Sequence, residues 1–317
     1  MRVVYFGTPL FAVASLDALL SSSHEVVGVV TQPDRPRGRG HHVTAAPVKA
    51  LADARGIASL QPTRLSDAAF LDAVRAWQAD IGVVAAYGRL LPQPLLDIPP
   101  RGLINVHASL LPRWRGAAPV HRAVAAGDDT TGVTIMRVVL ALDAGPALAM
   151  RATSIAADET SEELESRLAR MGAELLIATL ACLEAGSVVE VPQDESRVTY
   201  AARLTREDRH IDWSRTARDI HNQIRGLHPW PLVSAILEGR RVILRRSIVL
   251  PDTPAGGPPG TITEAHGDRL VVATGSGALQ VTHVQPEGGK PLTARAFLNG
   301  GHARVGDSFH PVPGEAR

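Results

Sequence analysis

The sequence predicts an α/β fold, in which an N-terminal doubly wound, mostly parallel sheet is followed by a smaller C-terminal β domain. Short apolar runs alternate with helical patterns over the first part of the chain, which is typical of parallel sheets. A polar, charge-rich stretch at residues 187–213 lacks periodicity, as expected of a connector between domains. After it, β-like runs are separated by glycine and proline turns, which favours a small β-barrel.

The N-terminal sheet is predicted from apolar runs of strand length. The run at residues 3–6 is stopped by Gly7, Thr8 and Pro9, and a helical pattern follows at 11–20. The alternation continues with strands expected at 25–31, 81–87, 103–106, 131–139 and 147–155, and with helices expected at 48–55 and 67–78.

A long amphipathic helix is predicted to start at Thr160–Glu163, where the sequence TSEE resembles a capping box. Its apolar residues recur at helical spacing and predict a stripe that packs in the core. The stripe consists of Leu164, Leu168, Met171, Leu175, Leu176 and Leu183. Cys182 lies in the same apolar stretch and is expected to be buried filler.

The domain boundary is placed in the polar connector, giving domains 1–205 and 206–317. The second domain should begin with a helix at 214–227 and continue into short strands. The strands are expected at 242–250, 260–265, 269–275 and 279–286.

Composition excludes several classes of protein. The chain has 317 residues with 45% hydrophobic content, which is enough for about two domains. It contains no long apolar run and no signal peptide, so we expect a cytoplasmic protein without a membrane span. A single cysteine excludes an internal disulfide and a cysteine-based zinc cluster, and we expect no metal. No exposed apolar helix demands a partner, and a monomer is expected.

The net charge is only +1, so nucleic-acid contact would have to come from a local patch. One such patch stands out at residues 35–42, RPRGRGHH, which holds three arginines and two histidines without an acid.

The first glycine turn, FGTPLFA, does not support a dinucleotide site. It lacks the G-x-G-x-x-G pattern and has Pro9 where a second close-approach glycine would be useful.

Asn105 and His107 are the first candidates for chemistry. They lie two residues apart at the end of an apolar strand, and therefore share one face of it. Carboxyl ends of strands line the ligand crevice of open α/β sheets, so both side chains should face a substrate. Acyl transfer is a natural use, because an amide can donate to the developing oxyanion while an imidazole donates or shuttles a proton. Asp143, just past the next β run, is the best acidic partner.

Here the sequence resembles the folate-dependent formyltransferase family. The hallmark of that family is Asn-x-His followed by Ser-Leu-Leu-Pro and a downstream Leu-Asp-x-Gly, and this chain has Asn105, His107, Ser109–Pro112 and Leu142–Gly145. Within the family, several segments of the sequence are similar to the branch that acts on methionyl-tRNA. The matching segments are GTPLFA (7–12), TQPDRPRGRG (31–40), AAYGRLLP (85–92), LLPRWRGAAP (110–119), TGVTIM (131–136) and HPWP (228–231).

The resemblance implies a Rossmann-like formyltransferase fold in the N-terminal catalytic domain and an OB-like, tRNA-contacting β-barrel in the C-terminal domain. It implies transfer of the formyl group of 10-formyltetrahydrofolate to the amino group of methionyl-initiator tRNA, giving N-formylmethionyl-tRNA for translation initiation. Asn105, His107 and Asp143 take the catalytic roles. The loop against the reduced pterin is formed by Ser109, Leu110, Leu111 and Pro112, and the strand end at Tyr87 and Gly88 lines the same pocket.

The basic loop at residues 34–42 is the expected tRNA reader. In the enzymes that it resembles, one basic residue of this loop enters the acceptor stem, and the matching position here is Arg39. Arg35 and Arg37 should add contacts to the tRNA backbone.

Two departures from the family pattern concern the site. Ala108 stands where glycine is common, and the loop before Asp143 reads VVLALDAGP in place of an acidic, glycine-containing version. Neither removes a catalytic candidate, but rate or folate fit could differ modestly from the family norm.

Three other functions use parts of the same pattern. A formyltransferase acting on a nucleotide-sugar amine shares the folate chemistry, and a formyl-folate hydrolase would use the same trio with water. A catalytically silent RNA-binding module would need neither Asn105 nor Asp143. The arginine loop favours tRNA as the acceptor.

Overall fold

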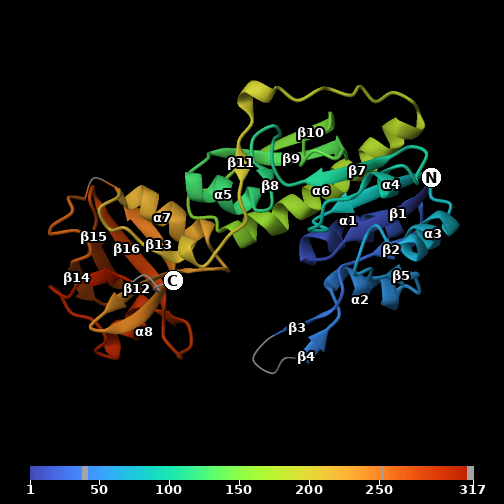
Figure 1. Ribbon diagram of the computed structural model, residues 1–317. Coiled ribbons are helices and arrows are strands. Elements are labelled where there is room, and N and C mark those ends of the chain that lie inside the picture. Colours follow the sequence, from blue (N-terminus) through green and yellow to red (C-terminus); the bar gives the residue numbers. More distant parts are fainter. Residues whose placement is uncertain (38–41, 252, 313–317) are drawn as a thin grey trace. The chain divides into compact units, whose positions relative to one another are not determined.

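The computed structural model describes residues 1–37, 42–251 and 253–312 of the chain (Figure 1). The chain divides into two compact units that are not contiguous in sequence. The first consists of Met1–Pro119, Thr130–Ser154 and Glu165–Ala201, and the second of Val120–Asp129, Ile155–Leu164 and Ala202–Arg317. The boundary expected at residue 206 stays a prediction.

The first unit is built on a seven-stranded sheet in the order β10-β9-β7-β6-β1-β2-β5. Five neighbouring strands are parallel, and β9 and β10 add an antiparallel edge. The strands are β1 (Arg2–Gly7), β2 (Glu25–Val30), β5 (Ser59–Leu60), β6 (Ile81–Ala85), β7 (Leu103–His107), β9 (Thr130–Arg137) and β10 (Ala147–Ser154).

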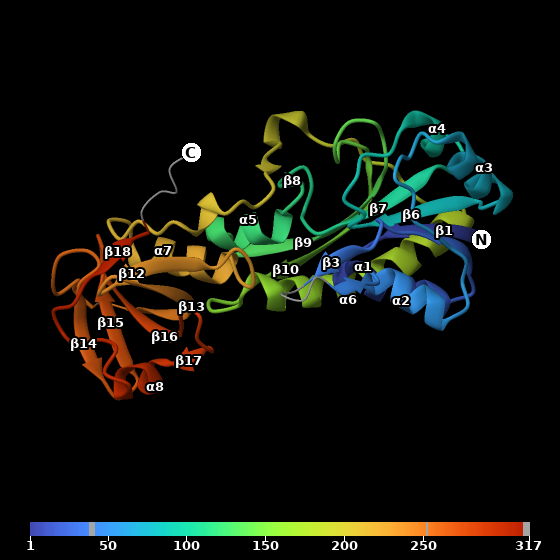
Figure 2. The same ribbon diagram turned by 60° about the horizontal axis from the view of Figure 1, so that its bottom comes forward.

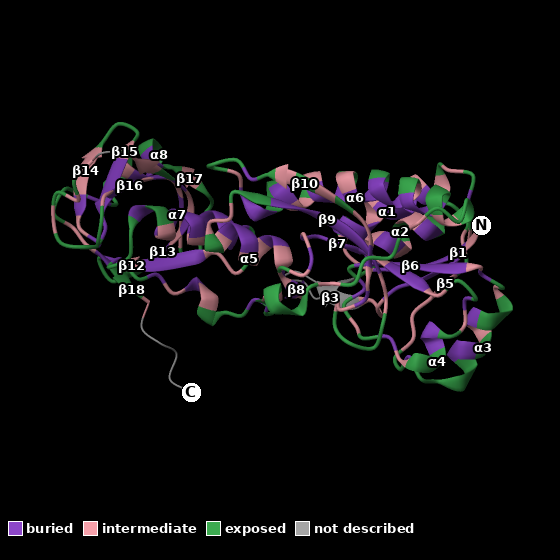
Figure 3. Cartoon of the chain, turned by 90° about the horizontal axis from the view of Figure 1, so that it is seen from above, coloured by how far each residue is buried: buried purple, intermediate pink, exposed green. Residues whose placement is uncertain are grey.

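Helices cover both faces of this sheet, so the predicted doubly wound, mostly parallel architecture is confirmed. Figures 2 and 3 show α1, α2 and α6 on one face and α3 and α4 on the other. Strands β1 and β6 are almost entirely buried, as expected of parallel strands between two helical layers. The helices are α1 (Leu10–Leu20), α2 (Pro47–Ala54), α3 (Ala68–Ala76), α4 (Gln93–Leu96) and α6 (Ser161–Glu184).

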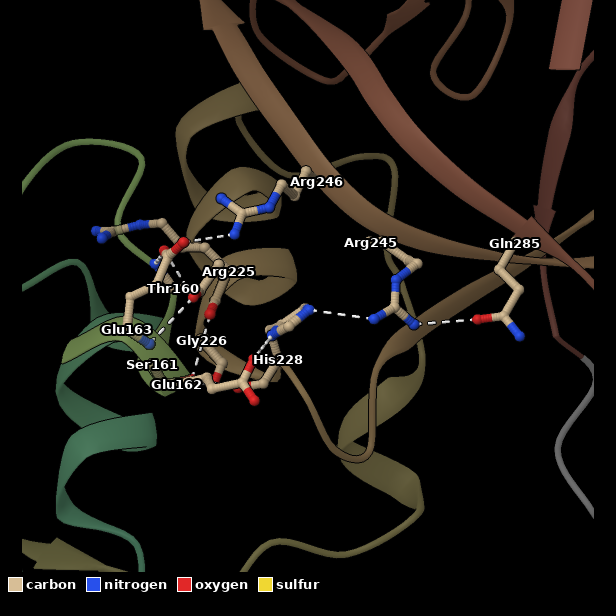
Figure 4. Close-up of polar contacts among 10 residues, drawn as sticks. All are labelled: Thr160, Ser161, Glu162, Glu163, Arg225, Gly226, His228, Arg245, Arg246 and Gln285. Carbon is tan, nitrogen blue, oxygen red and sulfur yellow. Dashed lines mark hydrogen bonds and ion pairs between the residues drawn. The ribbon is translucent and has the colours of Figure 1, made fainter. Parts of the chain in front are cut away.

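Helix α6 begins with the predicted capping box. The Thr160 N–H donates to Glu163 Oε2 at 2.9 Å, and the Glu163 N–H donates to Thr160 Oγ1 at 3.3 Å. This first turn belongs to the second unit, where Arg246 pairs with Glu163 (Figure 4).

The apolar stripe of α6 is buried along most of the helix, but the expectation for Cys182 was wrong. Leu164, Leu168 and Leu176 are fully buried, whereas Cys182 is exposed. The series 168, 175 and 182 repeats every seven residues, and an α-helix drifts by about 20° per heptad, which turns the last member away from the core.

The basic segment between β2 and α2 is more regular than the loop that we expected. It forms a two-stranded antiparallel ladder of β3 (Arg35–Arg37) and β4 (His42–Thr44), with Arg35 opposite Thr44. Residues 38–41 between these strands lie outside the described part of the chain.

The second unit is a curled antiparallel sheet in the order β14-β15-β16-β13-β12-β18, with β17 paired to β16. Its two ends meet where Thr261 bridges Ser308 and the Phe309 N–H donates to the Gly260 carbonyl at 2.8 Å. This closure fits the predicted OB-like barrel. The strands are β12 (Val233–Leu237), β13 (Arg240–Leu250), β14 (Ile262–His266), β15 (Arg269–Ala273), β16 (Ala278–Pro286), β17 (Leu292–Thr293) and β18 (Phe309–Pro311).

Three helices belong to the second unit: α5 (Pro119–Ala126), except for its first residue, α7 (Ala217–Gly226) and α8 (Ala294–Asn299). Across the described ranges, we find no helix with the length and apolar character that crossing a membrane requires.

The connector holds only short elements. These are two 3-10 turns, Glu195–Arg197 and Glu207–Arg209, and strand β11 (Tyr200–Ala201), which pairs in parallel with β8 (Arg115–Gly116).

Candidate functional site

Asn105 and His107 lie at the carboxyl end of β7, beside the end of β6 and the interior of the antiparallel strand β9. Val84 of β6 is opposite Asn105, and Thr134 of β9 is opposite His107. Between the two candidates, Val106 faces α6, because a Cβ added at Gly172 of that helix would lie 2.8 Å from Val106 Cγ1. Asn105 and His107 therefore share the face of the sheet that points away from α6.

The imidazole of His107 is hydrogen-bonded through one nitrogen and faces a carboxylate with the other. Nε2 lies 3.0 Å from the carbonyl oxygen of Trp114, which can only accept, so Nε2 carries a proton. Nδ1 lies 3.7 Å from Asp143 Oδ2, beyond hydrogen-bond range but close enough for attraction to a proton on that nitrogen. The ring is buried, so its orientation is fixed by these neighbours.

Asp143 lies in the loop between β9 and β10 and reaches His107 in the folded chain. Its Oδ2 also accepts a hydrogen bond of 2.9 Å from the Gly116 N–H. Its backbone has a φ of +48°, in the left-handed region that non-glycine residues rarely adopt. The structure thus brings together His107 and Asp143, which are 36 positions apart in the chain (143 − 107).

The segment Ser109–Pro112 follows β7 directly and is pinned to β9 by one side chain. Thr134 Oγ1 donates to the Ser109 carbonyl at 2.7 Å and accepts from the Leu111 N–H at 3.1 Å. Ser109 Oγ donates to the Arg113 carbonyl at 2.6 Å. Ser109 and Leu111 are buried while Leu110 and Pro112 are partly exposed, so the loop offers uncharged backbone and aliphatic surface.

Ala108, where the family commonly has glycine, is buried beside this loop. Its methyl group therefore packs into the protein and leaves the exposed side of the loop unchanged.

Tyr87 and Gly88 follow β6, and the two residues play different structural parts. The Tyr87 ring is buried edge-on against Phe6 at 5.8 Å between centroids, and burial raises the pKa of its hydroxyl. The Tyr87 carbonyl accepts from Gln32 Nε2 at 2.7 Å. Gly88 is exposed with a φ of +79°, and a Cβ there would lie 2.7 Å from Gln32 Nε2. This strand end can therefore present backbone, not the tyrosine ring, to a ligand.

Two of the three arginines expected to read tRNA belong to the β3–β4 ladder. The backbones of Arg35 and Arg37 form β3. Arg39 lies outside the described residues.

Sequence reasoning missed the residues that hold the candidates in place, chiefly Thr134 and Trp114. The signal for Thr134 was available, because a threonine in β9 paired with His107 of β7 must share its face of the sheet. The contact from the Trp114 carbonyl is made by a backbone with a φ of +65° at Trp114, which no residue pattern predicts.

Groups of three or more histidine, cysteine, aspartate or glutamate side chains that could hold a metal ion do not occur among the residues that the structure describes.

Comparison with known proteins defines the class of protein. Residues 1–180 match the formyl transferase family model, and residues 203–302 match the model of the formyl transferase C-terminal domain. The chain belongs to the formyl transferase family and is a one-carbon formyltransferase.

The curated relatives are more specific. A methionyl-tRNA formyltransferase of Symbiobacterium thermophilum is 44% identical over all of both chains. One of Paraburkholderia phytofirmans is 45% identical over 98% of this chain and 97% of its own.

The fold recurs at much lower identity. An N-formyltransferase of Helicobacter canadensis, solved in complex with folinic acid and dTDP-3-aminofucose, superposes with a TM-score of 0.68. It is 15% identical, with 89% of this chain and 98% of that chain covered.

Proposed function

We propose that this enzyme transfers the formyl group of 10-formyltetrahydrofolate to the free amino group of methionyl-initiator tRNA, giving N-formylmethionyl-tRNA for translation initiation. The observation that carries the proposal is the identity of 44–45% to methionyl-tRNA formyltransferases over nearly the whole chain. The geometry of His107 and Asp143 supports it, because the imidazole and the carboxylate lie 3.7 Å apart and can act together on one proton.

The reaction joins the methionyl nitrogen to the formyl carbon and breaks the bond between that carbon and N10 of the folate. The attacking amine loses a proton and the departing nitrogen gains one, so the step is balanced without an oxidant or a metal. The site must stabilise an oxyanion and move a proton.

Asn105, His107 and Asp143 are the residues proposed for these two tasks. The Asn105 amide donates to the developing oxyanion, and the His107 imidazole donates to it or shuttles the proton. When Nδ1 of His107 takes up a proton, the Asp143 carboxylate 3.7 Å away stabilises the imidazolium that forms.

The reduced folate is proposed to bind at Ser109, Leu110, Leu111 and Pro112, with the backbone at Tyr87 and Gly88 beside it. When bound, the folate supplies the activated formyl group. The loop fits a pterin because it is uncharged and firmly held by Thr134, and because Leu110 and Pro112 leave aliphatic surface exposed.

For the tRNA side, we propose that Arg39 contacts the acceptor stem and that Arg35 and Arg37 contact phosphates nearby. The enzyme is proposed to act as a monomer in the cytoplasm, without a metal.

The direct test is formylation of methionyl-initiator tRNA by the purified enzyme with 10-formyltetrahydrofolate as donor. The expected result is one formyl group per methionyl-tRNA, removed together with the amino acid when the ester is cleaved. Incorporation no higher than in an enzyme-free blank would contradict the proposal.

A further inference from the structure

We propose that the segment from Glu190 to Ala201, called the strap below, positions Asp143 for formyl transfer and that Gln193 is its central positioning residue. The inference rests on the function proposed above. The sequence indicated only a connector here, and in Figure 1 the chain after α6 runs to β11, which lies beside β8.

The strap first holds the loop that carries Asp143. Glu190 pairs with Arg137 at 2.7 Å at the end of β9. The Ala147 and Val191 backbones exchange two hydrogen bonds of 2.8 Å at the start of β10. Both ends of the loop are thereby fastened to one short stretch of chain.

The strap then holds the segment after the folate loop. The Trp114 N–H donates to Thr199 Oγ1 at 2.9 Å, and the Arg115 N–H donates to the Thr199 carbonyl at 2.9 Å. The Ala117 N–H donates to the Ala201 carbonyl at 2.9 Å. This is the segment whose Trp114 carbonyl faces His107 and whose Gly116 N–H binds Asp143.

Gln193 links the loop that carries Asp143 to the segment after the folate loop through its side-chain amide. Its Nε2 donates to the Asp143 carbonyl at 2.8 Å and to the Gly145 carbonyl at 2.7 Å. Its Oε1 accepts from Arg115 Nε at 3.0 Å and from the Arg115 terminal nitrogen Nη2 at 2.9 Å. Only a side chain with two donors and an acceptor satisfies all four contacts, which is the chemistry of a glutamine amide.

Arg115 is itself held firmly, so Gln193 is anchored to a rigid partner. Its side chain is 3% exposed and pairs with Glu195 of the strap at 2.7 Å. The hydrogen bond from Arg115 lowers the pKa of Glu195, which keeps this carboxylate ionised.

The consequence for catalysis follows from the backbone at Asp143. A non-glycine residue with a φ of +48° costs free energy and persists only where its surroundings over-determine it. Gln193 binds the carbonyl of that residue, and Gly116 binds its carboxylate. Without the Gln193 contacts, the loop can relax and Asp143 moves away from His107.

Two substitutions of Gln193 test the proposal. Gln193→Glu keeps the length and the acceptor for Arg115 but replaces both donors by an acceptor that repels the Asp143 and Gly145 carbonyls. Gln193→Met removes the hydrogen bonds without adding charge. The control is Asp194→Asn, because the adjacent Asp194 caps a 3-10 turn through Ser196 and asparagine keeps that cap.

We expect both Gln193 variants to lower kcat ten- to a hundredfold, since small displacements of catalytic groups have effects of this order. The KM values for folate and tRNA should stay close to wild type, and Asp194→Asn should match wild type throughout. A kcat within twofold of wild type overturns the proposal, and so does a loss that appears in KM or in melting temperature alone.

Amide hydrogen exchange separates this proposal from the proposed function. Peptides covering 138–147 should exchange faster in both Gln193 variants than in wild type or Asp194→Asn, whatever the acceptor of the formyl group is. Unchanged exchange overturns the strap proposal. Failure of the wild-type enzyme to formylate methionyl-tRNA overturns the proposed function instead.

Discussion

At the scale of single residues, His107 and Asp143 are oriented by backbone groups of neighbouring residues. The Trp114 carbonyl sets which nitrogen of His107 carries its proton, and the Gly116 N–H orients the carboxylate of Asp143. Backbone groups supply one side of each contact, so neither contact depends on the side chain of residue 114 or 116.

Substitution of Asn105 or Asp143 by alanine should reduce kcat by about two to three orders of magnitude, the range seen when one oxyanion donor is lost. Affinity for tRNA should be retained, because neither side chain is proposed to hold it. Turnover and tRNA binding are measured on the same preparations, with Asp72→Ala on the exposed face of α3 as control. Equal loss of turnover and of tRNA affinity in both variants would contradict this division of roles.

The candidate trio could be proposed from the sequence because Asn105 and His107 lie at a strand end and all three residues match a family motif. Asn105 and His107 needed only the period of a strand. Gln193 and Arg115 were not found, since hydrogen bonds across 50 and 78 positions leave no local pattern.

At the scale of elements, the first turn of α6 shows how local sequence and distant contacts combine. Thr160 and Glu163 form the capping box that the sequence predicts, while Arg246 on β13 pairs with the same glutamate (Figure 4). Burial by itself would raise the pKa of Glu163, but the hydrogen bonds from Arg246 and Thr160 outweigh it and lower the pKa to about 2.

Glu163→Ala should lower the free energy of unfolding by about 1 kcal/mol at neutral pH, as expected for a lost cap with a half-exposed ion pair. The folded pKa lies below the ordinary value of 4.5, so this stabilisation is present above pH 4.5 and is lost as the pH falls towards 2. Denaturant unfolding at several pH values checks this. Glu163→Gln, which retains the capping acceptor, should fall between wild type and alanine. If the difference in the free energy of unfolding between wild type and Glu163→Ala does not shrink on acidification, the proposed role of Glu163 is wrong.

Element prediction succeeded for segments with a clear apolar pattern and failed for the ladder of β3 and β4, which lacks one. The amphipathic pattern located α6, and apolar runs located β1, β6 and β7 to within two residues. The ladder of β3 and β4 was read as a loop because three-residue strands rich in arginine and histidine have no apolar alternation. The exposure of Cys182 shows that a stripe predicts burial only as far as the helix faces the core.

At the scale of the whole molecule, the charge balance restricts how a tRNA can be recognised. With 33 basic and 32 acidic residues, no overall field attracts nucleic acid, and binding has to use local clusters such as residues 35–42. The second unit contributes a further basic stretch on β13, where Arg245 binds Gln285 and Arg246 is engaged by Glu163. Both of these arginines already have partners within the unit, which favours the segment at 35–42 as the reader.

Arg39→Ala should raise the KM for methionyl-initiator tRNA and reduce the salt dependence of its binding by about one unit of slope, the amount expected for one lost phosphate contact. Folate binding should be unchanged. The comparison uses Arg75→Ala, because the Arg75 side chain is exposed and its ion pair is with Asp72 on the same helix. Weaker folate binding by Arg39→Ala would contradict the proposal that Arg39 contacts tRNA.

The central claim is that the formyl group goes to the amine of methionyl-initiator tRNA. The most direct measurement is transfer from 10-formyltetrahydrofolate to charged initiator tRNA, with charged elongator methionine tRNA and a UDP-amino sugar as parallel acceptors. We predict formylation of the initiator tRNA alone. Formylation of the sugar in preference to the initiator tRNA would contradict the claim, leaving the folate chemistry in place but assigning the segment at 35–42 to another role.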